Sequence, residues 1–127
     1  MHRQVAIKCV AQERMQSGRS DFIKEATVLH SLEHEHIVRL YGLVLGRDAL
    51  MLVSELAPLR SLLECLSDAQ LRHSFPVHRL CELAVQVCDG MAYLENKRLI
   101  HRDLAARNVL VFAKDKVRMA ATDIHPV

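Results

Sequence analysis

The 127-residue sequence predicts an α+β fold in which strands and one helix come first and a mainly helical part follows. Residues 5–10 alternate apolar side chains in the manner of a strand. Residues 37–45 and 49–56 are apolar and β-branched on either side of a turn, which predicts a hairpin. Residues 21–32 and 80–94 repeat apolar side chains at helical spacing.

The first strand and the first helix each carry a charge on an apolar face. Lys8 shares its face of the strand with Ala6, and Glu25 lies on the helical stripe made by Phe22, Ala26, Leu29 and Leu32. A buried charge is costly unless it is paired, so we expect a Lys8–Glu25 ion pair. The alternative is that Lys8 extends past a strand edge and Glu25 is solvated, because the four-residue pattern VAIK is weak by itself.

The part that follows the hairpin is expected to be helical. Pro58 blocks continuation of the strand, and residues 61–68 then predict a short helix, followed by a linking loop over residues 71–76. The longer helix has a core-facing stripe of Leu80, Leu83, Ala84, Val87, Met91 and Leu94. This stripe indicates packing against other helices, and the helix ends just before His101.

Three histidines, His30, His34 and His36, suggest a metal site, since the first two are four residues apart. No second cluster of Cys or Glu provides a fourth ligand at a usual spacing. We therefore expect His34 and His36 to cap the turn after the helix through hydrogen bonds.

Residues 101–108 read HRDLAARN and place an acid, Asp103, five positions before a carboxamide, Asn108. The pair suits phosphoryl transfer, because Asp103 can accept a hydroxyl proton and Asn108 can offer an oxygen to magnesium, while Arg107 adds a planar cation. A polar run after a helix is otherwise an ordinary solvated turn. The apolar stretch 109–112 that follows favours a catalytic loop held between two ordered elements.

HRDLAARN resembles the catalytic loop of protein tyrosine kinases, with Ala105 where serine/threonine kinases usually carry Lys, which implies tyrosine as acceptor. The stretches DFIKEATVLHSLEHEHIVRLYGLVL, SELAPLRSLLE and AVQVCDGMAYLENKRLIHRDLAARNVL resemble the Ack family of non-receptor tyrosine kinases. The resemblance covers residues 4–118.

The resemblance implies an incomplete two-lobed protein kinase fold: N-lobe strands and a helix, then the first helices and the catalytic loop of the C-lobe. Residues 1–56 are expected to form a partial N-lobe that lacks the Gly-rich loop. Residues 57–127 are expected to contain the hinge and the beginning of the C-lobe, ending before a complete activation segment.

The resemblance also implies the site residues and the cofactors, ATP and Mg²⁺. Asp103 and Arg107 take catalytic roles, and Asn108 binds metal. Among the residues expected to bind ATP, Ser54 is the gatekeeper and the Lys8–Glu25 pair lies at the phosphates. The full set is Ala6, Lys8, Glu25, Ser54, Glu55, Leu56, Ala57 and Leu110. Arg60 departs from the family, which usually has Gly at this point and therefore a less crowded and less basic lip of the nucleotide cleft.

Two further departures argue against activity of this chain alone. No Gly occurs among the residues before Lys8, so the phosphate-covering lid is expected to be missing. Ala121, Thr122 and Asp123 stand where Asp-Phe-Gly is expected, and alanine has no side-chain oxygen for a hard cation. Asp123 is two residues late, a displacement of about 6–7 Å.

Composition excludes several classes of protein. The net charge of +2 is too balanced to indicate nucleic-acid binding, and no apolar run is long enough for a membrane span. Cys9, Cys65, Cys81 and Cys88 lack metal spacing, which favours free thiols and a cytoplasmic setting. By resemblance the partners are ATP and a protein substrate with an acceptor tyrosine. Small-GTPase or adaptor partners, and recruitment to membranes, would involve regions absent here.

Three hypotheses remain open at this point. The chain is an incomplete product of an Ack-type tyrosine kinase gene, a non-catalytic pseudokinase-like binding module or decoy, or a kinase segment whose residues from about Ala120 come from an alternative exon. The first is supported by Lys8, Glu25, Asp103 and Asn108, and the second by Ala121 at the metal position.

Overall fold

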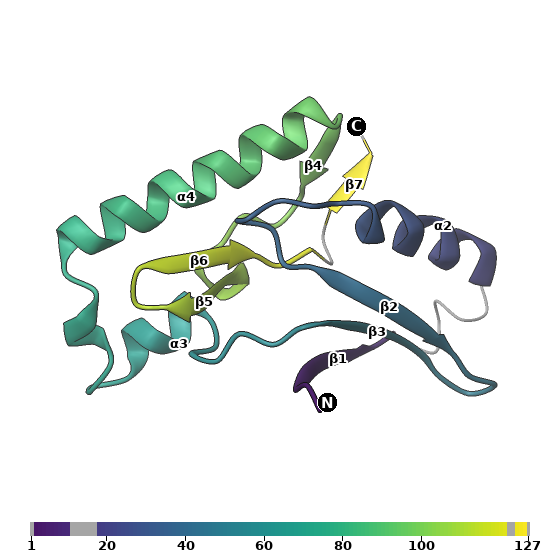
Figure 1. Cartoon of the computed structure of the whole chain (residues 1–127), viewed down its shortest axis with the longest axis horizontal. Helices are drawn as coiled ribbons and strands as arrows, with labels where there is room; N and C mark the ends of the chain where they lie inside the picture. Colours follow the sequence, from purple (N-terminus) through teal and green to yellow (C-terminus); the bar gives the residue numbers. More distant parts are fainter. Residues whose placement is uncertain (1, 11–17, 122–123, 127) are drawn as a thin grey trace. The chain divides into compact units, whose positions relative to one another are not determined.

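The computed structural model describes residues 2–10, 18–121 and 124–126 (Figure 1). The chain divides into two compact units. The first comprises residues 1–33 and 39–56, and the second comprises residues 34–38 and 57–127. The short segment 34–38 thus interrupts the first unit in sequence but belongs to the second.

The first unit is a three-stranded antiparallel sheet with one helix. Its elements are β1 (Val5–Cys9), α2 (Arg19–His30), β2 (Leu40–Leu45) and β3 (Leu50–Glu55), and the strand order is β1-β3-β2. Helix α2 packs against β2. The four apolar residues of the predicted stripe are buried, although the helix ends at His30, so that Leu32 lies just after it and not on it. Apolar residues of the sheet are buried with them: Leu40, Leu50 and Leu52.

The predicted hairpin is confirmed in β2 and β3, where Leu45 pairs with Leu50. The Gly46 N–H donates to the Ala49 carbonyl at 2.8 Å, and a Cβ at position 46 would lie 3.0 Å from that oxygen. The close approach explains why glycine suits this turn. The strand expected over residues 37–45 begins only at Leu40.

The second unit contains the remaining elements. They are α3 (Leu62–Ser67), the 3₁₀ turn η1 (Arg72–Ser74), α4 (Val77–Asn96), β4 (Leu99–His101), the 3₁₀ turn η2 (Ala106–Asn108), β5 (Val109–Ala113), β6 (Lys116–Met119) and β7 (Ile124–Pro126). Strand β4 pairs with β7 and β5 pairs with β6, both antiparallel. Helix α4 packs on β6 and β4.

The short helix expected over residues 61–68 is confirmed as α3, and the sequence explains its first turn. Ser61 is the N-cap, and its Oγ accepts a 3.1 Å hydrogen bond from the Glu64 N–H. The Glu64 carboxylate in turn accepts from the Ser61 N–H at 3.4 Å. This reciprocal capping satisfies two backbone donors that the helix itself leaves without partners.

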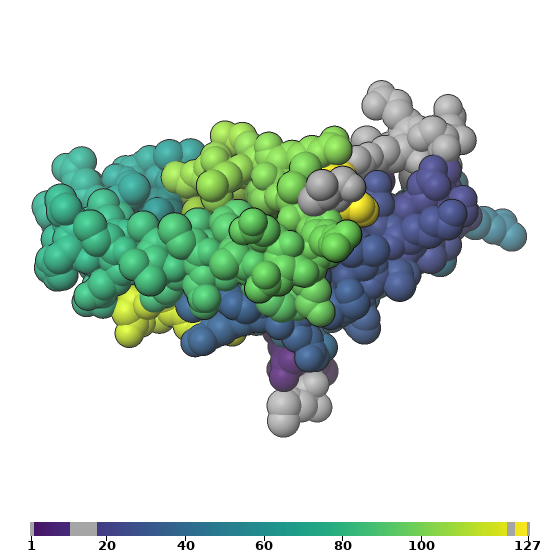
Figure 2. All heavy atoms as spheres, turned by 90° about the horizontal axis from the view of Figure 1, so that it is seen from above, coloured from purple at the N-terminus to yellow at the C-terminus, as the bar shows by residue number. Residues whose placement is uncertain are grey.

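Helix α4 has the apolar stripe that the sequence predicts, although it is only partly covered. Leu83 and Leu94 are each 1% exposed, whereas Ala84 is exposed. Figure 2 shows α4, in teal to green, uncovered along the face in view. None of the helices in the described part of the chain combines the length and apolarity that crossing a bilayer requires.

The side chain of Gln86 joins α4 to the β5–β6 hairpin. Its Nε2 donates to the Asp115 carbonyl at 2.7 Å, and its Oε1 accepts from the Val117 N–H at 2.9 Å. The amide therefore satisfies both a backbone acceptor and a backbone donor at the hairpin. This contact fixes the hairpin that follows the 101–108 loop.

Candidate functional site in the loop between β4 and β5

The HRDLAARN loop is anchored at both ends. It leaves β4, which pairs with β7, and enters β5, which pairs with β6. The η2 turn covers Ala106–Asn108, and Asn108 at its end contacts Asp103 near the start of the loop. The prediction of a polar loop held between two ordered elements is confirmed.

Asp103 and Asn108, the acid and the amide singled out in the sequence, are in contact. Asn108 Nδ2 donates to Asp103 Oδ2 at 3.0 Å and to the Asp103 backbone carbonyl at 2.8 Å. Arg107 Nη2 forms an ion pair with the other carboxylate oxygen, Oδ1. Because Asn108 turns its nitrogen to Asp103, its carboxamide oxygen points away from the carboxylate and is available to a ligand.

The charge of Asp103 is stabilised by these neighbours. The hydrogen bond from the Arg107 guanidinium is the largest cause that holds the pKa of Asp103 below its usual value, and the Asn108 amide acts in the same direction. The side chain of Asp103 is 39% exposed, so solvent still reaches the carboxylate. The group is therefore ionised at neutral pH and can accept a hydrogen bond or a proton.

His101 ties the loop to the end of β6, a role that sequence reasoning did not assign. The Asp103 N–H donates to His101 Nδ1 at 3.1 Å, so the ring proton is on Nε2, which donates to the Ala120 carbonyl at 2.9 Å. The Ala120 N–H donates to the Asn108 carbonyl at 2.9 Å. No spacing rule connects positions 101 and 120, because only the folded hairpin brings them together.

Ala121, at the position where the family resemblance implies a metal-binding acid, is only 7% exposed. Its methyl group offers no ligand atom to a cation. Asp123, the acid two residues further on, lies outside the described residues. Within the 101–108 loop, the side-chain oxygens that could serve a hard cation belong to Asn108 and Asp103, and the Asp103 carboxylate already contacts Arg107 and Asn108.

Lys8 and Glu25, predicted to pair inside the first unit, are both exposed. Within the described residues no ion pair joins them, so the expected burial and pairing of these two charges are wrong for this structure. The position of Glu25 around the axis of α2 explains its exposure. The covered face of α2 is centred on Phe22, Ala26 and Leu29, and Glu25 lies at its edge, where a long side chain reaches solvent.

The other expected nucleotide-binding residues lie near the end of β3 and in the second unit. Ala6 pairs with Ser54 across β1 and β3, and both are half-buried. Glu55 accepts a 2.7 Å hydrogen bond from the Arg39 N–H, so its side chain has a structural role in the first unit.

The remaining three of these residues are Leu56, Ala57 and Leu110. Leu56 is 42% exposed and Ala57 is 8% exposed. Leu110, on β5, is half-buried and forms a bridge with Ser61.

Arg60, where the family resemblance implies Gly, adopts a backbone conformation that glycine enters more easily than other residues. Its φ of 66° lies in the left-handed region, which L-residues occupy at a cost. Its N–H donates to the Ala57 carbonyl at 3.2 Å, its carbonyl accepts from Val111 at 2.7 Å, and its Nη1 lies 3.0 Å from Glu64. The predicted departure from the family pattern therefore coincides with a strained position that β5 holds in place.

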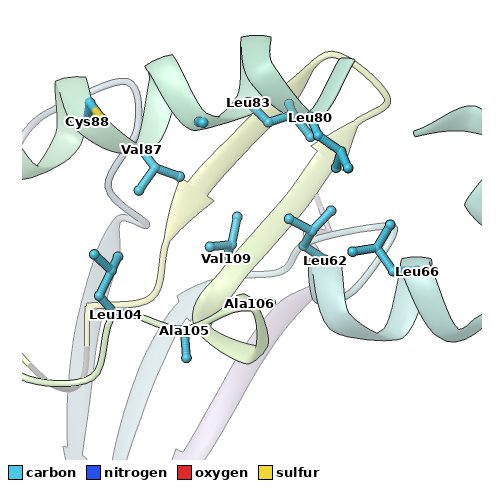
Figure 3. A pocket seen from close by; sticks show the side chains of 11 residues that line it. Leu62, Leu66, Leu80, Leu83, Val87, Cys88, Leu104, Ala105, Ala106 and Val109 are labelled. Atoms are coloured by element: carbon cyan, nitrogen blue, oxygen red, sulfur yellow. The ribbon is translucent and has the colours of Figure 1, made fainter. Parts of the chain in front are cut away.

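An apolar pocket of about 480 Å³ lies beside the loop within the second unit (Figure 3). Side chains from α3, α4, the loop and β5 line it: Leu62, Leu66, Leu80, Leu83, Ala84, Val87, Cys88, Leu104, Ala105, Ala106 and Val109. No charged side chain lines it, so it does not suit a polyphosphate. It does explain why the predicted stripe of α4 is incompletely covered.

The histidines have the structural role that the sequence favoured. The His36 N–H donates to His34 Nδ1 at 3.0 Å, and His36 Nδ1 lies 2.9 Å from the Val117 carbonyl. His34 Nε2 is also 3.5 Å from the Asp89 carboxylate on α4. These contacts hold the segment 34–38 within the second unit.

Comparison with known proteins agrees with this architecture and loop. Residues 1–125 match the family model described as protein tyrosine and serine/threonine kinase. The chain is 67% identical over 118 residues to an "Activated Cdc42 kinase-like" protein of Drosophila melanogaster, covering 92% of this chain and 9% of that protein. It is 56% identical over 117 residues to an "Ack-related non-receptor tyrosine kinase" of Caenorhabditis elegans, covering 92% of this chain and 11% of that protein.

The "Tyrosine-protein kinase Shark" of Drosophila melanogaster is 42% identical over 120 residues, which cover 92% of this chain and 12% of that protein. The α+β fold, together with a loop in which Arg107 and Asn108 both contact Asp103, is that of a protein kinase domain segment. The chain belongs to the protein tyrosine and serine/threonine kinase family, and its relatives include Ack-type non-receptor tyrosine kinases. It spans about a tenth of the length of the curated relatives named here.

Proposed function

We propose that this chain carries the substrate-hydroxyl half of an ATP-dependent protein tyrosine kinase site and that, by itself, it transfers no phosphate. The observation that carries this proposal is the combination of an ordered Asp103–Asn108 pair with a buried alanine at position 121. The Asp103–Asn108 pair orients an acceptor hydroxyl, and the alanine at position 121 provides no metal ligand.

Asp103 is the proposed general base. Its lowered pKa keeps the carboxylate ionised, and its exposure leaves it accessible to a tyrosine hydroxyl. Arg107 fixes one carboxylate oxygen and adds positive charge where phosphate charge would gather. Both roles agree with the family mechanism, in which positioning and electrostatics provide most of the rate acceleration.

Within the part of the chain that the structure describes, the side chains near the loop do not make up a complete magnesium site. Kinases of this family use Mg²⁺ with ATP, and Mg²⁺ requires near-octahedral oxygen ligands, commonly including one or two carboxylates. Here Asn108 offers one carboxamide oxygen, while Ala121 offers none. We therefore assign no step of phosphoryl transfer to a metal ion held by this chain.

Nucleotide contacts are proposed at the end of β3 and in the segment after it, with Ser54 as gatekeeper. Among the described residues, no hydrogen bond engages the Ala57 N–H, which leaves a nearly buried donor for the edge of a purine. Together with Ala6, Lys8, Glu25, Glu55, Leu56 and Leu110, these residues make up the proposed ATP site. The proposed domain boundary falls between residues 56 and 57.

A second candidate function is a non-catalytic binding module that holds nucleotide weakly or competes for a kinase's partners. Ala121 favours it, because the loss of one metal ligand impairs transfer more than it impairs nucleotide binding through the backbone. In either case we propose a cytoplasmic setting for the parent protein and, if it is active, a tyrosine-containing protein as substrate.

Phosphate transfer and metal binding are tested together. The purified chain, an Asp103→Asn variant and an Ala121→Asp variant are incubated with ATP, Mg²⁺ and a tyrosine peptide, and phosphopeptide is measured by mass spectrometry. We expect the unmodified chain to form no more phosphopeptide than the Asp103→Asn variant. Turnover by the unmodified chain that Asp103→Asn abolishes would contradict the proposal.

Thermal unfolding provides a second readout. A ligand that binds only the folded chain raises its melting temperature. We expect Mg²⁺ alone to stabilise Ala121→Asp, whose new carboxylate is costly to bury without a cation, and not the unmodified chain. Stabilisation by ATP without phosphate transfer would favour the binding-module candidate.

A further inference from the structure

The two tyrosines of this chain differ in accessibility. Tyr41, on β2, is 36% exposed. Tyr93, on α4, is half-buried, with its ring centroid 4.8 Å from that of His34 and the Lys97 ammonium 5.8 Å from its centroid. An enzyme that modifies a phenol hydroxyl would therefore reach Tyr41 more easily than Tyr93.

Arg3 holds the Tyr41 ring from one side. Arg3 Nη1 donates to Tyr41 Oη at 3.3 Å, and the guanidinium carbon lies 5.6 Å from the ring centroid. A guanidinium at this position is within reach of the three oxygens of a phosphate attached to Oη, and such a pair is charge-assisted and bidentate. The structure thus presents a cation beside the tyrosine hydroxyl before any phosphate is present.

The backbone around Tyr41 is easier to release than a regular central strand. In the described sheet β2 is an edge strand, and its pairing with β3 shifts register between Leu40 and Gly42. Tyr41 is the residue at this bulge and has no partner in the ladder. A Cβ built on the neighbouring Gly42 would meet nothing within 4 Å, so the space next to the tyrosine is open.

We propose that Tyr41 is a phosphorylation site for a separate protein tyrosine kinase, and that Arg3 holds the resulting phosphate. In this reaction the Tyr41 oxygen forms a bond to the γ-phosphorus of ATP, the bond between that phosphorus and the β–γ bridging oxygen breaks, and ADP leaves. The phenol proton passes to the catalytic carboxylate of the modifying kinase. Because another enzyme supplies the catalysis, the inference does not depend on activity of this chain.

The modification replaces one weak hydrogen bond by a charged pair. Phosphate adds about −1.5 to −2 charges at neutral pH. Since Arg3 precedes β1 and Tyr41 is on β2, the new pair links the two outer strands across β3. We therefore expect phosphorylation to stabilise the sheet and raise the melting temperature by about 3 °C.

The test uses the full chain, ATP with Mg²⁺ and an active non-receptor tyrosine kinase. Intact mass and peptide mapping identify the modified residue, with Tyr41→Phe and Tyr93→Phe as matched variants. We expect one phosphate, on Tyr41, lost in Tyr41→Phe and retained in Tyr93→Phe. The thermal stabilisation should disappear in a phosphorylated Arg3→Gln variant, whose unphosphorylated form melts close to the unmodified chain.

A peptide spanning residues 36–47 reports whether the kinase accepts the local sequence. Absence of phosphate on Tyr41 in the folded chain overturns the proposal, whether or not the peptide reacts. Preferential modification of Tyr93 overturns it as well. Equal stabilisation with Arg3 and with Gln at position 3 overturns the assignment of Arg3 as the phosphate partner.

Discussion

Substitution of Gly90 by alanine tests how closely α4 approaches the segment 34–38. A Cβ at position 90 would lie 3.0 Å from the His36 carbonyl oxygen and 3.3 Å from Ile37 Cδ1. The carbonyl is held in place, because it accepts a 2.9 Å hydrogen bond from the Met119 N–H, and Ile37 is 2% exposed. An added methyl group therefore has no free space to enter.

The magnitudes decide the direction of the effect. Alanine gains about 1 kcal/mol over glycine in helix propensity and about 0.8 kcal/mol from burial of a methyl group. Overpacking costs about 1–3 kcal/mol, and a fixed backbone carbonyl places Gly90 at the upper end of that range. We expect a net loss of about 1 kcal/mol, which lowers the melting temperature by about 4 °C in a chain of this size.

Urea unfolding followed by far-UV circular dichroism measures this difference. Ala92→Gly is the matched control, since Ala92 is exposed on the same helix and should lose about 1 kcal/mol through propensity alone. A Gly90→Ala variant that is more stable than the unmodified chain would refute the close approach of α4 to the His36 carbonyl.

Three further substitutions follow from the structure. Arg60→Gly should raise the free energy of unfolding by about 0.5 kcal/mol, because relief of a left-handed conformation outweighs the flexibility of glycine and the loss of an exposed ion pair. Gln86→Leu should lower the free energy of unfolding by about 2 kcal/mol, because the Val117 N–H loses its acceptor. The Val117 amide should then exchange its hydrogen faster than in the unmodified chain. Arg107→Gln should raise the pKa of Asp103 toward its ordinary value, as an NMR titration of the carboxyl carbon would show.

The sign of the pH dependence follows from the direction of that pKa shift. A carboxyl group with a lowered pKa in the folded chain contributes stability above its ordinary pKa, and the contribution is lost as pH falls through the lowered value. Arg107→Gln should therefore reduce stability at neutral pH and leave the acid limit unchanged. In a chain that carries Asp103→Asn, Arg107→Gln should cause no further change in the dependence of stability on pH.

Matched variants test the predictions for Arg60→Gly and Gln86→Leu. Glu64→Gln removes the Arg60 ion pair without changing the backbone, so it should be slightly less stable than the unmodified chain. An Arg60→Gly variant that loses as much would show that φ at this position carries no strain. Gln86→Glu keeps an acceptor for Val117 but turns a carboxylate oxygen toward the Asp115 carbonyl, so hydrogen exchange of the Val117 amide is its readout. Exchange as fast as in Gln86→Leu would contradict the assigned hydrogen bond.

Local sequence pattern was sufficient for most elements of this chain. The first strand, the β2–β3 hairpin and the helices follow from side-chain periodicity and from turn residues, which act over a few positions, whereas β4 and β7 were not predicted. The Asp103–Asn108 contact was also predictable, because one η2 turn brings residues five apart together. The helix over residues 61–68 was predicted, whereas its cap by Ser61 and Glu64 was identified only in the structure.

Tertiary structure decided which charges are paired and which backbone groups meet. Periodicity placed Glu25 on an apolar stripe, yet that position lies at the edge of the covered face and is exposed. The contact of His101 with the Ala120 carbonyl and the assignment of residues 34–38 to the second unit depend on segments far apart in sequence. Such long-range contacts leave no regular spacing in the chain.

The sequence by itself determined the family, the HRDLAARN loop and the presence of alanine at position 121, since these depend on residue identity. Only the tertiary structure showed that Arg60 is left-handed, that Tyr41 stands at a bulge beside Arg3, and that Asp103 is held by Arg107. The physical reason is that backbone strain and charge pairing are properties of positions in space, which residue order specifies only through the folded chain.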